Sequence, residues 1–192
     1  MLTKRDKEIL NWIQDYDILT INQAKSLFFN NVYDNARRRL RVLEQQGILN
    51  SYICKDSKEK VYCVDKKRSQ HDIYIVDFIA KLITLDCNVL EFKLKPHYLN
   101  GDLIPDAFVK FSQGDDLYLV LLEIDYKHAT EMLKFKSLYE RLYRERDKHE
   151  EFLNTFPMIV VASFKETIRY TSNNFYCLFT DFEFKNLKDL LF

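Results

Sequence analysis

The first 46 residues carry apolar positions that recur every three or four residues, the spacing of one face of a helix. Thr3 and Thr20 each precede such a stretch, where a hydroxyl caps the free N–H groups of a helix start. Asp6 follows Thr3 by three residues, as in a short-chain variant of the capping box. A third helix is expected from Val32 to Gln46, ending at Gly47 because glycine readily adopts left-handed backbone. The pattern therefore predicts three successive helices.

Two β-like stretches follow the third helix, over Ile48–Cys54 and Val61–Val64. The polar residues between them predict the tip of a hairpin. Asn30-Asn31 predicts a tight turn before the third helix, since Asn tolerates turn and left-handed backbone. Helix, helix, turn, helix and hairpin is the element order of a winged helix-turn-helix, which we expect over residues 1–68.

The third expected helix carries a cluster of arginines on its polar side. Its apolar side is formed by Ala36, Leu40 and Leu43. An advance of about 100° per residue turns the arginines away from that side. Such a helix fits the major groove, where Arg bonds guanine edges or phosphates, and lysines of the hairpin would contact the backbone or minor groove. The candidate DNA-binding residues are Asn35, Arg37, Arg38, Arg41, Lys55, Lys58 and Lys60.

Two alternatives to DNA binding remain open for this segment. The arginine run is also compatible with a solvated helix face, which most charge runs form. A winged helix that binds only protein is the other alternative. In favour of DNA, the segment from Arg37 to Leu49 resembles the recognition helix and the start of the wing in many bacterial regulators.

The charge of the chain is unevenly distributed although its formal net charge is zero. Residues 1–68 hold 14 Lys and Arg against 9 Asp and Glu, and the remaining residues hold 15 against 20. The basic N-terminal part favours a polyanionic partner such as double-stranded DNA. The charged N-terminus is unlike a signal peptide, and no apolar run reaches about 18 residues. Four Cys without a C-x-x-C pair indicate reduced thiols, so we expect a cytoplasmic protein without membrane contact.

The acidic part, residues 69–192, alternates between helical and strand-like patterns. Leu117–Ile124 is almost continuously apolar, which is typical of a central strand buried on both faces. Expected helices cover Asp72–Leu85, Ala129–Leu153, Phe164–Tyr170 and Phe184–Leu191, and expected strands cover Val89–Lys95, Ile104–Phe111, Leu117–Ile124, Met158–Ala162 and Tyr176–Thr180. The fold class expected for the whole chain is therefore α+β, with a winged helix followed by an α/β domain.

Three short motifs in the acidic part carry a family resemblance. Pro105-Asp106 begins one expected strand, Glu123-Ile124-Asp125 ends the next, and Lys136-Ser137-Leu138-Tyr139 lies on the long helix. This layout resembles the PD-(D/E)xK nuclease-like fold. The whole chain more closely resembles the replication-relaxation proteins of plasmids and integrative elements in Gram-positive bacteria. The resemblance implies sequence-specific DNA binding in plasmid replication, transfer or transcriptional control. Residues 69–192 would form a homodimer or contact a replication or transfer protein.

The acidic residues of these motifs define an alternative function, a metal-dependent DNA nuclease. Such an enzyme needs carboxylates, here Asp106 and Glu123, to hold Mg²⁺, and a lysine to orient water or stabilise charge. The lysine expected two residues after Glu123 is replaced by Asp125, and Lys127 follows two residues later. Asp125 favours either a metal or a structural role as a helix cap. The missing lysine favours a degenerate scaffold without catalytic residues or cofactor.

Overall fold

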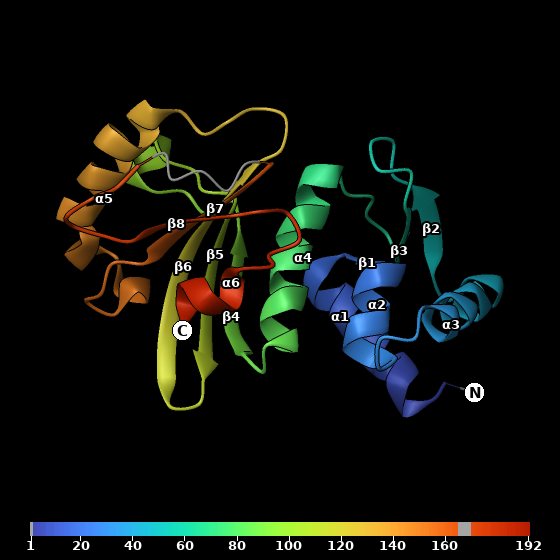
Figure 1. Cartoon of the computed structure of the whole chain (residues 1–192). Helices are drawn as coiled ribbons and strands as arrows, with labels where there is room; N and C mark the ends of the chain where they lie inside the picture. The colour runs from blue at the N-terminus through green and yellow to red at the C-terminus, as the bar shows by residue number, and fades with distance from the viewer. Residues whose placement is uncertain (1, 165–169) are drawn as a thin grey trace. The chain divides into compact units, whose positions relative to one another are not determined.

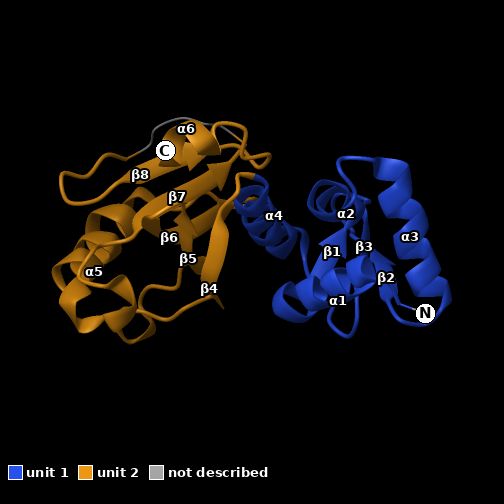
Figure 2. Cartoon of the chain, turned by 90° about the horizontal axis from the view of Figure 1, so that it is seen from below, with its two compact units in different colours: residues 1–84 blue, residues 85–192 orange. Residues whose placement is uncertain are grey.

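The computed structural model describes residues 2–164 and 170–192 (Figure 1). The chain divides into two compact units, Met1–Thr84 and Leu85–Phe192 (Figure 2). The sequence pattern puts the domain boundary after residue 68, but helix α4 (Gln70–Thr84) groups with the first unit. One contact that ties it there is a hydrogen bond of 2.7 Å from Gln23 Nε2, on helix α2, to Asp77 Oδ1 on α4.

The first unit combines four helices with a small antiparallel sheet. Its elements are α1 (Lys4–Tyr16), β1 (Ile18–Thr20), α2 (Ile21–Phe28), α3 (Tyr33–Gln45), β2 (Asn50–Ile53), β3 (Lys60–Cys63) and α4. The strand order is β1-β3-β2. The three-residue strand β1 lies between the first two helices, where the sequence pattern predicts only a turn.

The predicted helix boundaries of the first unit are confirmed at four positions. Thr3 and Thr20 both accept hydrogen bonds as N-caps and form complete capping boxes, the second of them with Gln23. Asn31 has a φ of 63° in the turn before α3, and Gly47 has a φ of 68° just after it. The left-handed backbone at Asn31 separates α2 from α3, and that at Gly47 ends α3 before strand β2.

The second unit is built on a five-stranded mixed sheet of order β4-β5-β6-β7-β8. The strands are β4 (Asn88–Leu94), β5 (Ala107–Gln113), β6 (Asp116–Asp125), β7 (Met158–Ser163) and β8 (Cys177–Thr180). The first three are antiparallel, and β7 and β8 run parallel to β6. Residues 119–125 of β6 are all buried, as expected for a central strand.

The long helix expected over Ala129–Leu153 is confirmed only in part, because the chain is continuously helical over residues 132–144 alone. This stretch contains the π-helix η2 (Lys134–Tyr139) and α5 (Glu140–Arg144), and the 3₁₀ turns η3 (Arg146–Lys148) and η4 (Glu150–Phe152) follow it. Extended backbone at His149 separates η3 from η4, and a φ of 51° at Leu153 ends the run. Buried rings of this connection, including Phe135, pack on the same core as Phe108 and Phe179 of the sheet.

The ends of the second unit differ from the sequence pattern in smaller ways. A 3₁₀ turn η1 (Leu99–Gly101) lies between β4 and β5, outside the expected elements. The closing helix α6 covers only Leu187–Leu191. The helix expected over Phe164–Tyr170 falls largely on residues 165–169, which lie outside the described residues. Within the described part of the chain, no helix is long and apolar enough to cross a membrane.

Candidate functional site

Helix α3 presents a row of arginines to solvent. Its other side is fully buried through Ala36, Leu40 and Leu43, each 0% exposed. The exposed arginines are Arg37, Arg38 and Arg41, and Asn35 is exposed beside them. Asp34 approaches Arg37 only to 3.9 Å, and both side chains remain largely in water, so this contact holds the guanidinium weakly. The face therefore offers hydrogen-bond donors and positive charge to an outside partner.

The fourth arginine of the run, Arg39, has a different place. Its Nε lies 2.7 Å from Asp6 Oδ1, and its Nη2 bonds the other oxygen of the same carboxylate. Asp6 is 0% exposed and also accepts hydrogen bonds from the backbone N–H and hydroxyl of Thr3. The hydrogen bonds from Arg39 hold the pKa of Asp6 well below its usual range, against the opposing effect of burial. Arg39 therefore anchors α3 to the start of α1.

The hairpin between β2 and β3 carries the three expected lysines, but they are not equivalent. Lys55 and Lys58 are exposed at its tip, where Lys58 Nζ donates to the backbone oxygen of Lys55 at 2.7 Å. Lys60 instead bonds Glu44 of α3 at 2.6 Å and is only half-exposed. This hydrogen bond lowers the pKa of Glu44 and raises that of Lys60. The sequence pattern groups Lys60 with the DNA contacts, whereas its geometry fits a link between the hairpin and α3.

In the second unit, Asp106 directly precedes β5 and lies near Glu123 at the end of β6. The backbone N–H of Asp106 donates to the backbone oxygen of Leu122 at 2.9 Å, and the charge of Asp106 contributes to raising the pKa of Glu123. The Asp106 carboxylate accepts a hydrogen bond of 2.7 Å from the backbone N–H of Ile124. The convergence suggested by the sequence is therefore present, but one Asp106 oxygen already binds backbone.

Glu123 is held by two side chains from the following π-helix η2. Lys134 Nζ lies 2.6 Å from Glu123 Oε1, and the hydroxyl of Tyr139 donates to the same oxygen. Burial raises the pKa of Glu123 to about 7, while Lys134 and Tyr139 act in the opposite direction. Burial likewise raises the pKa of Tyr139 well above its ordinary value. Lys134, which the sequence pattern misses, is thus the lysine that reaches the acidic pair.

The two remaining candidates, Asp125 and Lys127, have other places. Asp125 Oδ1 accepts hydrogen bonds from the Thr130 backbone N–H at 2.8 Å and from its hydroxyl at 2.5 Å. Asp125 thus has a structural hydrogen-bonding role in the chain after β6, where its bonds to Thr130 precede the helical stretch without capping it. Lys127 is exposed, with its ammonium 5.6 Å above the ring of Tyr126. The catalytic position of Lys127 stays a prediction.

The acidic residues do not fit a Mg²⁺ site. A magnesium ion takes free carboxylate oxygens in octahedral geometry, but Glu123 Oε1 binds Lys134 and Tyr139, and Asp125 Oδ1 binds Thr130. Among residues 2–164 and 170–192, no three His, Cys, Asp or Glu side chains lie together as metal ligands would. We derive no metal-dependent step from this arrangement.

The sequence matches no protein-family model, no curated protein and no solved structure.

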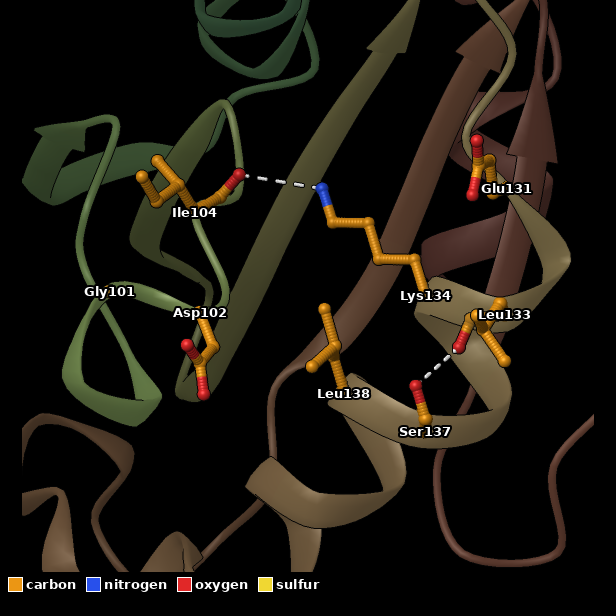
Figure 3. A pocket seen from close by; sticks show the side chains of 8 residues that line it. All are labelled: Gly101, Asp102, Ile104, Glu131, Leu133, Lys134, Ser137 and Leu138. Atoms are coloured by element: carbon orange, nitrogen blue, oxygen red, sulfur yellow. Dashed lines mark hydrogen bonds between the residues drawn. The ribbon is translucent and has the colours of Figure 1, made fainter.

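Lys134 also borders a cavity of about 520 Å³ on the surface of the second unit (Figure 3). Its ammonium lies 3.4 Å from the backbone oxygen of Ile104 across this cavity. The apolar side chains of Leu133 and Leu138 and the acidic side chains of Asp102 and Glu131 also line this cavity. Lys134 is paired with buried Glu123, and Asp102 is paired with Arg141 at 3.1 Å.

Proposed function

We propose that the chain binds double-stranded DNA through its first unit, with α3 in the major groove. The observation that carries this proposal is the division of α3 into a fully buried side and an exposed side bearing Arg37, Arg38 and Arg41. Arginine donates two hydrogen bonds to the O6 and N7 atoms of guanine and also binds phosphate. The 13 residues of α3 span about 20 Å, enough to follow the groove for several base pairs.

The connectivity of the first unit supports a winged helix as the DNA-binding fold. Two helices precede α3, a tight turn at Asn30 and Asn31 separates α2 from it, and a hairpin follows. The strand order β1-β3-β2 places the hairpin on the small sheet. In such a fold the hairpin lies beside the duplex, so exposed Lys55 and Lys58 would contact phosphates.

For the second unit we propose a role in assembly, as a dimer contact or a surface for a replication or transfer protein of a mobile element. The motifs around Asp106 and Glu123 are the ones that resemble replication-relaxation proteins. A dimer would place two first units on repeated half-sites, where their binding free energies add. Sedimentation velocity of the full chain at micromolar concentration tests the dimer contact. A dimer would support self-assembly, and a monomer would leave contact with a replication or transfer protein as the proposed role of the second unit.

A metal-dependent nuclease is the second candidate function. It is favoured by the proximity of Asp106 to Glu123 and by the contact of Lys134 with Glu123. It is disfavoured by the hydrogen bonds that already occupy oxygens of both carboxylates.

Salt dependence distinguishes DNA binding from a helix face that is merely solvated or binds only protein. Each phosphate contact releases counterions, so the logarithm of the affinity falls linearly with the logarithm of salt concentration, by about 0.9 per contact. Fluorescence anisotropy of a labelled 24-base-pair duplex of random sequence, titrated between about 50 and 200 mM KCl, measures this slope. A slope of about −2.7 is expected if Arg38, Lys55 and Lys58 each contact one phosphate. Absence of binding at the lowest salt would contradict the proposal.

A further inference from the structure

The first unit contains a cavity of about 420 Å³ between the start of α1 and one flank of α3. Arg5 and Phe29 line it from one side, and Asn35 and Arg38 line it from α3. The ion pair of Asp6 and Arg39 also borders it. The sequence pattern assigns no role to Arg5, and it gives Arg38 the same role as Arg37 and Arg41.

The charges around this cavity do not cancel. The only carboxylate among its lining residues, that of Asp6, is buried and paired with Arg39. Arg5 and Arg38 add two positive charges, and in the part of the chain that the structure describes no carboxylate lies within 4.0 Å of either. A cavity with two uncompensated guanidinium groups attracts an anion.

Both guanidinium groups are held in place before any ligand arrives. The Cζ atom of Arg5 lies 4.7 Å from the centre of the Phe29 ring, so the cation rests on the aromatic face and keeps its N–H groups for a ligand. Arg38 Nη2 donates to Asn35 Oδ1 at 3.0 Å, which fixes this side chain from the preceding turn. Two planar forks held at one cavity suit the oxygens of a phosphate group.

The position of Arg38 also separates it from the other exposed arginines. Arg38 differs from Arg37 and Arg41 in its contacts: its guanidinium bonds Asn35 and lines the cavity, whereas Arg37 and Arg41 are not among the lining residues. Phosphate contacts fix the register of a helix in the groove, and base contacts provide the sequence specificity.

We propose that this cavity binds a single phosphodiester of the DNA backbone, jointly through Arg5 and Arg38. This inference rests on the proposed function and deepens it: Arg38 sets the register of α3 on the duplex, and Arg37 and Arg41 read bases. If the two arginines share one phosphate, removing both should lower the salt slope by the value for one phosphate contact and not for two.

The test compares Arg5→Ala, Arg38→Ala and the double variant with the parent and with Lys136→Ala, an exposed lysine of the second unit. The probes are a 24-base-pair duplex of random sequence and the duplex enriched by selection of a random library on the parent protein. Each single variant should weaken binding of both duplexes equally, by about threefold to tenfold at 100 mM KCl. The salt slope of the double variant should fall by about 0.9, the value for one phosphate, and not by about 1.8.

Three results would overturn the inference in distinguishable ways. Selective loss of binding to the enriched duplex in Arg38→Ala would show that Arg38 reads a base. Displacement of the duplex by inorganic phosphate at matched ionic strength would assign the cavity to a free phosphate group. A double variant that keeps the parent salt slope on both duplexes would rule out the phosphate site while leaving DNA binding by α3 intact. If the parent itself binds neither duplex, the proposed function fails and the phosphate site falls with it.

Discussion

Arg39 of α3 forms an ion pair with Asp6 of α1, whose carboxylate is fully buried. Asp6 is at the same time the capping-box partner of Thr3. One carboxylate thus closes the first turn of α1 and fixes the helix that carries the exposed arginines. The orientation of the arginine face depends on this pair.

Arg39→Ala should lower the free energy of unfolding by about 2–3 kcal/mol, because it leaves the buried Asp6 carboxylate without its cation. Arg38→Ala, one residue away and exposed, is the matched control and should change it by less than about 0.5 kcal/mol. Urea unfolding followed by circular dichroism measures both. Equal stabilities of the two variants would contradict the anchoring role of Arg39.

The same pair predicts a loss of stability in acid. The folded-state pKa of Asp6 lies below its ordinary value of 3.8, so the unfolded chain takes up a proton first as the pH falls. The contribution of Asp6 is therefore complete above about pH 5 and declines below pH 3.8. Asp6→Asn should lose this part of the acid dependence, and unfolding curves of the parent and variant between pH 3 and 6 would show it. Parallel curves would contradict the assignment.

Glu123 should titrate near neutral pH. Burial raises its pKa to about 7, so between its ordinary value of 4.5 and about 7 the folded chain holds a proton that the unfolded chain has lost. Over this window the contribution of Glu123 to stability falls as the pH rises. The side-chain carboxyl carbon of Glu123, followed by NMR, should show the midpoint directly. Lys134→Ala should move the midpoint upward, since the lost ammonium favours the ionised form; a downward shift would refute the ion pair.

We expect no DNA cleavage with Mg²⁺ or Mn²⁺. The position two residues after Glu123 holds Asp125, and Lys134 neutralises Glu123 instead of approaching a free metal site. Supercoiled plasmid incubated with the parent and with Asp106→Ala provides the measurement. Nicking by the parent that Asp106→Ala lacks would promote the nuclease alternative over the assembly role.

The hairpin lysines should separate into two classes. Replacing Lys55 and Lys58 by Ala should reduce affinity for enriched and random duplexes alike and flatten the salt slope by up to about two units, because both side chains are exposed at the tip. Lys60→Ala should leave the slope nearly unchanged, because its ammonium binds Glu44. A larger slope change from Lys60 than from Lys58 would reverse this division.

Local pattern was sufficient for the features that depend on neighbouring residues. The caps at Thr3 and Thr20, the turn at Asn31 and the buried side of α3 all follow from short-range rules. The expected burial of the central strand β6 holds for the same reason, since a continuous apolar run needs cover on both faces.

Features that depend on partners distant in sequence were missed. Helical spacing left Arg39 out of the exposed arginines, but it did not predict the partner of Arg39, because Asp6 lies on another helix. Lys134 replaces Lys127 beside Glu123 because a π-helix, which the sequence pattern does not announce, turns it toward the sheet. Lys60 is likewise withdrawn from the hairpin tip by Glu44.

The measurement that most directly tests the central claim compares DNA affinity after equal losses of charge on the two units. One variant carries Arg37→Ala with Arg41→Ala, and its control carries Lys136→Ala with Lys188→Ala, two exposed lysines of the second unit. Both should fold like the parent. At 100 mM KCl the arginine variant should bind the enriched duplex more weakly by about 2 kcal/mol or more and should lose its preference over random sequence. The lysine control should bind like the parent. Equal affinities of the two variants would contradict DNA recognition by α3.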